Sequence, residues 1–171
     1  MASTFIERCK RAWRHRTSTA AKGRLAFPAD TLAQLGAAIT AGEQRHRGEL
    51  RLIVENSMPS EAIWADLNNR QRALALFAEY GVWDTEDNCG VLVYVNLAEH
   101  KVDIVVDRGI GRTISPEVWQ EVCGTMTRGF ARGEFGASTL AAVERINSLL
   151  AQQFPATGAR TNELPDQPMV L

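Results

Sequence analysis

The most constraining feature of this chain is a pair of short apolar runs joined by a tight turn. The runs, Val91–Val95 and Lys101–Asp107, are rich in β-branched residues and are connected through Leu97-Ala98-Glu99-His100. This pattern predicts an antiparallel hairpin. An acidic loop at residues 84–88 precedes the hairpin, and Arg108-Gly109 follows it. Because an antiparallel return brings the end of the second strand beside the start of the first, we expect the loop and Asp107 to be neighbours.

The segments around the hairpin predict the rest of the architecture. Residues 49–55 alternate as a strand, and a helical pattern over residues 60–80 separates them from the hairpin. A strand, a helix and a strand in this order predict a βαβ unit whose two strands are parallel, with a right-handed crossover. Further helices are predicted over residues 28–45, from Ser115-Pro116 onward, and over residues 137–154. The expected fold class is α/β, as an α/β/α sandwich with a small mixed sheet.

The chain divides into three predicted parts. Its 171 residues suffice for one domain with a core of its own, which we place at residues 25–154. Residues 1–24 are predicted to form a basic amphipathic arm. Residues 155–171, in which Pro, Thr, Asn and Gln dominate, are predicted to form a disordered tail.

The arm differs sharply in charge from the rest of the chain. It carries seven Lys or Arg and one Glu, a charge of +6, whereas the remainder carries 12 basic and 19 acidic side chains, a charge of −7. Phe5, Ile6, Cys9 and Trp13 fall on one face of a helix. One interpretation is that this stripe docks on the acidic body. The other is a surface helix that contacts anionic lipid or an acidic partner protein through basic side chains, namely Arg8, Lys10, Arg11, Arg14 and Arg16.

Several function classes are disfavoured by the sequence. An acidic body would repel phosphate, so a nucleic-acid partner is not expected. No apolar run approaches the roughly 18 residues that would span a bilayer, and the first residues lack the apolar core of a secretion signal. We therefore expect a cytoplasmic protein, peripheral at the membrane where the arm binds it. The chain has neither a G-x-S-x-G nor a phosphate-loop motif.

Oxygen-bearing side chains in and around the acidic loop predict a cation site. Asp84, Glu86 and Asn88 alternate like the first ligands of a calcium-binding loop. Asp107, at the end of the neighbouring strand, should lie beside the loop. Glu49 begins the parallel strand at the same edge of the sheet. The hypothesis is a calcium ion or similar divalent cation, and the alternative is a solvated turn in which Asp87 or Asn88 caps the local backbone. The predicted ligands are Asp84, Glu86, Asp87, Asn88, Asp107 and Glu49.

Parts of the sequence resemble the TPM domain family, whose members include thylakoid-lumen phosphatase-like and photosystem II repair proteins. The similar segments are Gly48–Val54, Trp83-Asp84 with Asn88–Val93, Asp107–Ile110, and Trp119 with the stretch from Phe130 to Phe135. Other segments, Glu43–Glu49, Val82–Glu86 and Leu97–His100, are similar to a short bacterial subgroup without a membrane anchor. The resemblance implies an α/β/α sandwich, divalent-cation binding in the loop that holds Asp84, Asp87 and Asn88, and either acid phosphatase activity or an accessory role.

Two functions follow as hypotheses. The favoured one is a non-catalytic accessory or binding module that works with a protein or a membrane-associated partner. The alternative is a weak metal-dependent acid phosphatase, in which a cation would polarise phosphoryl oxygens and Arg108 would neutralise charge. The substrate, the identity of the partner and the oligomeric state are not specified by the sequence.

Overall fold

A four-stranded mixed sheet forms the centre of the protein. The computed structural model describes residues 5–158 and 161–171, so residues 1–4 of the predicted arm and 159–160 of the predicted tail lie outside the described part. The strands follow the order β3-β2-β1-β4. β1 runs parallel to β2, which pairs antiparallel with β3, and both predictions are confirmed. Their bounds are β1 (Glu49–Glu55), β2 (Gly90–Asn96), β3 (Lys101–Val106) and β4 (Met169–Val170).

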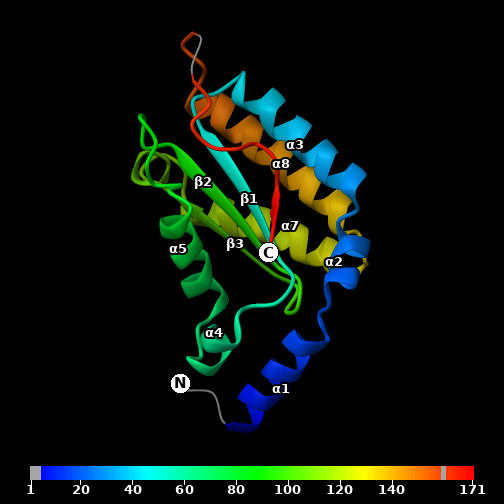
Figure 1. Ribbon diagram of the computed structural model, residues 1–171. Coiled ribbons are helices and arrows are strands. Elements are labelled where there is room, and N and C mark those ends of the chain that lie inside the picture. The colour runs from blue at the N-terminus through cyan, green and yellow to red at the C-terminus, as the bar shows by residue number, and fades with distance from the viewer. Residues whose placement is uncertain (1–4, 159–160) are drawn as a thin grey trace.

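Helices cover both faces of this sheet, which confirms the predicted sandwich (Figure 1). On one face lie α3 (Ala29–Glu43), α7 (Pro116–Ala131) and α8 (Phe135–Gln153). These helices pack on the strand residues of one parity, including Leu50, Leu52 and Val54. The other face packs on α5 (Asn69–Glu79) through a smaller cluster that includes Ile53, Leu92 and Tyr94. The alternation of strand side chains thus produces two cores rather than one.

The single helix predicted over residues 60–80 is wrong, because the chain breaks there into two helices. The first, α4 (Ser60–Trp64), ends before Asp66, whose φ of 57° lies in the left-handed region. Asn68 then begins α5 with a capping box, in which its side chain accepts from the Gln71 amide and the Gln71 side chain accepts from the Asn68 amide. Reciprocal capping satisfies two backbone donors and favours a new helix start over continuation.

The described part of the predicted disordered tail is ordered, so that prediction is wrong. β4 pairs parallel with the outer edge of β1 through Met169 and Val170. The guanidinium of Arg51, on a residue that is 5% exposed, donates to the carbonyl oxygens of Pro165 and Gln167 at 2.7 and 2.9 Å. A buried cation needs such acceptors, and the C-terminal segment supplies them here. The segment therefore closes one edge of the sheet (Figure 1).

The predicted arm forms two helices, α1 (Phe5–Thr17) and α2 (Ala20–Ala26), the second capped by Thr19. α1 contacts α4. The chain then enters the main core at Phe27, which is 2% exposed.

Candidate functional site

The acidic loop and Asp107 meet at one rim of the sheet, as predicted. The amide of Gly109 donates to the carbonyl of Asn88 at 3.1 Å, and the amide of Asp107 donates to the carbonyl of Gly90 at 2.9 Å. Glu49 joins the same rim, because its amide donates to the carbonyl of Cys89 at 3.0 Å. A Cβ on Gly109 would lie 2.6 Å from the Asn88 carbonyl oxygen, so only glycine allows this approach.

The side chains of the predicted ligands do not converge as their backbones do. Asp84 and Glu86 are exposed, and Asp87 lies 3.8 Å from the guanidinium of Arg47. Asn88, with φ 52°, is exposed at the loop end. Among residues 5–158 and 161–171, no group of three His, Cys, Asp or Glu side chains is arranged to hold a metal ion.

Asp107 is the most unusual of the predicted ligands. It is 7% exposed, and its Oδ1 accepts from the amide of Arg108 at the start of the short helix α6 (Arg108–Gly111). Its Oδ2 is buried and has no hydrogen-bond partner among the described residues. Since a buried carboxylate oxygen without a partner is costly, this atom marks a place where a cation or a water molecule would be stabilised. Asp107 lines a hollow of about 560 Å³ together with Arg70, Trp83, Asn88 and Arg108.

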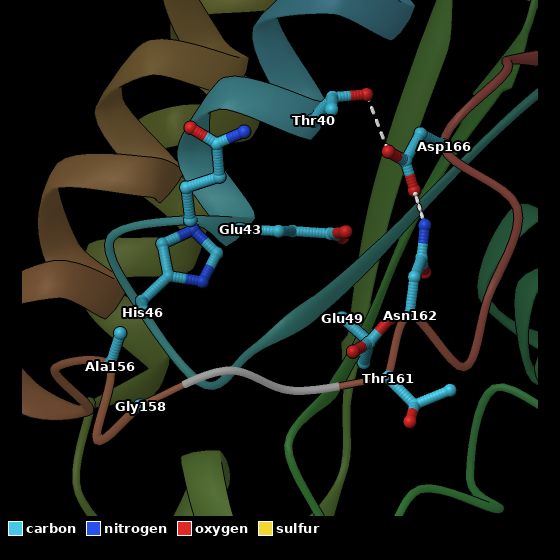
Figure 2. Close-up of a pocket in the computed structure, with 10 residues that line it drawn as sticks. Thr40, Glu43, His46, Glu49, Ala156, Gly158, Thr161, Asn162 and Asp166 are labelled. Atoms are coloured by element: carbon cyan, nitrogen blue, oxygen red, sulfur yellow. Dashed lines mark hydrogen bonds between the residues drawn. The ribbon is translucent and has the colours of Figure 1, made fainter.

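Glu49 faces a different hollow from the other predicted ligands. Its Oε2 accepts from the amides of Glu163 and Leu164 at 3.3 and 3.2 Å, in the C-terminal segment. The residue lines a hollow of about 340 Å³, into which the Glu43 side chain points (Figure 2). On the opposite wall, Asp166 accepts hydrogen bonds from Thr40 and Asn162.

The electrostatics of this second hollow were not predicted. Burial, together with the nearby carboxylates of Glu49 and Asp166, raises the pKa of Glu43 to about 9, although a hydrogen bond from the Leu50 amide opposes that shift. Glu43 is therefore a neutral acid near pH 7. The sequence did not indicate it because one partner, Asp166, belongs to the segment that was predicted to be disordered.

The face of α1 that packs on the body is opposite to the apolar face that was predicted to dock. Phe5, Ile6 and Trp13 are 74%, 65% and 68% exposed, and Cys9 is exposed as well, so docking through the apolar stripe is wrong. The polar face holds the helix instead. Arg11 donates from Nε to Glu99 and from Nη2 to the carbonyl of Leu67 at 2.6 Å.

His15 completes the buried junction beneath α1. It is 2% exposed, its Nδ1 accepts from the amide of Met58 at 3.1 Å, and its Nε2 lies 2.9 Å from Glu99. Since an amide can only donate, Nδ1 carries no hydrogen and Nε2–H donates to Glu99. Burial acts to raise the pKa of Glu99, but hydrogen bonds from His15, Lys101 and Arg11 outweigh it and hold that pKa well below its usual range.

The five basic residues that were predicted to contact a partner therefore have two different roles. Arg8 lies 3.7 Å from Asp66, and Arg11 belongs to the buried junction. Lys10, Arg14 and Arg16 are exposed beside the apolar stripe. Along α1, the exposed arc thus combines aromatic and aliphatic side chains with three cationic ones, which is typical of a helix at a charged interface.

The fold and its rim define an α/β/α domain with a mixed sheet and an acidic loop packed against a Gly-containing turn. The TPM domain family matches residues 25–149, and the chain belongs to this family. Its fold is similar to that in the NMR structure of the BA42 protein from the psychrophilic bacterium Bizionia argentinensis, with a TM-score of 0.74, 24% identity, and coverage of 84% of this chain and 94% of that one. No curated protein sequence matches this chain. Within the described residues, no helix is long and apolar enough to cross a membrane.

Proposed function

We propose that this protein is a non-catalytic TPM-domain accessory module that binds the cytoplasmic, anionic surface of a membrane through α1. The observation that carries the proposal is the orientation of that helix. Phe5, Ile6 and Trp13 face solvent, while Arg11 and His15 fix the opposite side to the body. Large apolar side chains grouped on one exposed arc are uncommon on a protein surface without a partner.

The charge distribution favours an anionic lipid surface over a neutral one. Lys10, Arg14 and Arg16 are exposed on the same helix and would meet lipid headgroups when the aromatic side chains enter the interface. Each basic side chain near an anionic leaflet contributes about 1 kcal/mol, so the three together contribute roughly 3 kcal/mol. The alternative occupant is the acidic surface of a partner protein, which would leave vesicles unbound.

The test is co-sedimentation with vesicles of phosphatidylcholine alone or mixed with phosphatidylglycerol. We expect binding to the anionic vesicles, its loss in a Phe5→Ser/Ile6→Ser/Trp13→Ser variant, and weakening with added salt. The matched control is Trp83→Ser, which removes a 54% exposed tryptophan that lies outside α1, beside Asp107 and Arg108, and should bind like wild type. Equal binding of the triple variant, or no binding of wild type, would refute the proposal.

A second proposal is a calcium ion at the rim, and the buried, unpartnered Oδ2 of Asp107 supports it. Asp84 and Asp87 would have to swing toward that oxygen, since the described acidic groups do not converge. An NMR titration with calcium should shift residues 84–90 and 107–111, and Asp107→Asn should abolish those shifts. Unchanged spectra at millimolar calcium would exclude the site.

The phosphatase hypothesis depends on that cation and is the lesser candidate. Arg70 and Arg108 line the same hollow as Asp107 and could neutralise a phosphoryl group beside a metal. Hydrolysis of a chromogenic phosphate ester, measured with and without chelator and in Asp107→Asn, tests it. Activity that is indifferent to both changes would remove this hypothesis.

A further inference from the structure

We infer that a hollow beside α2 binds one anionic phospholipid molecule, whose phosphate would lie beside Lys22 and His100 and whose acyl chains would lie against Leu97 and Phe135. This inference rests on the membrane role proposed above, because the membrane is the source of the lipid. The hollow has a volume of about 330 Å³, and its walls come from α2, from the turn between β2 and β3, and from the junction of α7 and α8. That volume lies within the range of small-molecule sites.

Two turns and the main core form the apolar wall of this hollow. The β2–β3 turn ends at His100, whose φ of 51° lies in the left-handed region, and α7 is followed by Gly133 in the same region, with a φ of 78°. The rings of His100 and Phe135 meet edge to face, with their centroids 5.4 Å apart. Leu97 is 7% exposed and Phe135 packs against the main core, so the core holds this wall in place.

The charge of this hollow differs from that of the two hollows described above. Among the described residues, no acidic side chain lines it. Carboxylates line both of the others, namely Glu43, Glu49 and Asp166 in one and Asp107 in the other. Residues 25–171 together carry a charge of −7, so a wall without carboxylates is not what their composition predicts. The lining therefore suits an anionic ligand.

Two donor side chains on these walls are not used by the protein itself. Within the described part of the chain, Lys22 forms no ion pair and the His100 imidazole forms no hydrogen bond. The acidic residues next to the walls in sequence are already paired, Glu99 in the junction beneath α1 and Glu134 with Arg132 at 2.6 Å. The ammonium and the imidazole N–H can therefore both donate to phosphate oxygens.

The position of the hollow favours a lipid over a dissolved anion. α1 leads directly into α2 (Figure 1), and Leu25 on the wall is 81% exposed, so it adds to the exposed apolar side chains of α1. A dissolved phosphate ester would satisfy the two donors but would leave the apolar wall in contact with water. A phospholipid supplies both the acceptor and the apolar surface, and the proposed contact of α1 with a membrane would bring it to the hollow.

The experiment is an NMR titration of the full-length, ¹⁵N-labelled protein with dihexanoyl phosphatidylglycerol below its critical micelle concentration. We expect saturable shifts in residues 22–26, 97–100 and 133–135. Dihexanoyl phosphatidylcholine has the same chains without net charge, and glycerophosphoglycerol has the same headgroup without chains. Each should bind at least about tenfold more weakly, because each lacks one of the two kinds of contact.

A charge reversal tests the cationic side of the hollow. Lys22→Glu should weaken binding of the phosphatidylglycerol by at least about tenfold, because an attraction is lost and a repulsion of similar size replaces it. Arg24→Glu is the matched control, since it makes the same change on the same helix at an exposed residue that does not line the hollow. Screening by salt should keep its affinity within about twofold of wild type.

The titration and the vesicle experiment report on different parts of the molecule. The short-chain lipid is dissolved singly, so the Phe5→Ser/Ile6→Ser/Trp13→Ser variant should bind it like wild type although that variant loses vesicle binding. Absent shifts at millimolar lipid, wild-type affinity in Lys22→Glu, or equal affinity for the phosphatidylcholine would overturn the inference. Loss of short-chain lipid binding in the triple variant would also overturn it, because the lipid would then bind α1 rather than the hollow.

Discussion

The buried junction beneath α1 makes a quantitative prediction for Glu99→Gln. The Glu99 side chain is 3% exposed and accepts from Arg11, His15 and Lys101. Removing one partner of a buried ion pair costs about 3–5 kcal/mol, because the remaining charge stays buried. Arg11 keeps its bond to the Leu67 carbonyl, and the Lys101 side chain is 56% exposed, so we expect the lower end, about 3 kcal/mol.

This loss should appear as local release of α1 rather than as global unfolding. Apart from this junction, α1 contacts chiefly α4, whereas α8 packs in the main core. Hydrogen exchange in residues 5–17 should accelerate about a hundredfold, the equivalent of about 3 kcal/mol, while α8 exchanges as before. Glu134→Gln is the matched control, because its partner Arg132 is exposed, and it should leave α1 unchanged.

The pH dependence of the same junction has a defined sign. The pKa of Glu99 is lower in the folded protein than in the unfolded chain. Its contribution to stability is therefore complete above the unfolded pKa, about 4.3, and is lost as the pH falls below it. The protection of α1 from exchange, taken relative to the intrinsic rate at each pH, should fall in wild type only in acid, and in Glu99→Gln it should depend less on pH. Equal exchange of α1 in both proteins at pH 7 would refute this account of the junction.

Three further predictions concern the rest of the domain. Glu55 is buried between Arg72 and the Tyr94 hydroxyl, at 2.6 Å from each, so Glu55→Ala should lower the free energy of unfolding by about 3–5 kcal/mol, and Tyr94→Phe by about 1 kcal/mol, in urea titrations. The pKa of Glu43 is raised to about 9, so stability should fall as the pH rises from about 5 to 9, and Glu43→Gln should flatten that dependence; a parallel profile would contradict it. A Cβ at Gly90 would lie 1.8 Å from a backbone oxygen of the preceding loop, so Gly90→Ala should fail to give a native-like NMR spectrum.

The sheet and its helices were predictable because each depends on local periodicity. The strand predicted over residues 49–55 from its alternating side chains has the same bounds as β1. Because successive strand side chains point to opposite faces, the same alternation separates the two cores. The break between α4 and α5 was not predicted because Asn68 lies within a continuous helical pattern of apolar residues. Its capping box involves only Asn68 and Gln71, so it does not disturb that pattern. The ordered tail was missed for the opposite reason. Its composition is that of a disordered segment, and its order depends on distant side chains such as Arg51.

The rim shows why backbone proximity was easier to predict than a site. Antiparallel pairing places Asp107 beside the acidic loop whatever the side chains do, and that expectation is correct. Whether carboxylates converge depends on their local partners. Asp87 approaches Arg47, and Glu49 accepts hydrogen bonds from backbone amides in the C-terminal segment, whose position beside this strand no local pattern predicts.

The orientation of α1 differs from the one that its hydrophobic pattern predicts, and the difference has a physical cause. An amphipathic helix is expected to bury its apolar stripe, because that burial usually contributes most to docking. Here the surface beneath the helix offers a buried carboxylate, Glu99, and a main-chain acceptor, and both select the face that carries Arg11 and His15. The apolar stripe therefore stays exposed to solvent, which is unfavourable unless a partner covers it. An arm fixed by polar contacts can present Phe5, Ile6 and Trp13 without having to unfold or rotate, which supports the membrane-binding role proposed for its outer face.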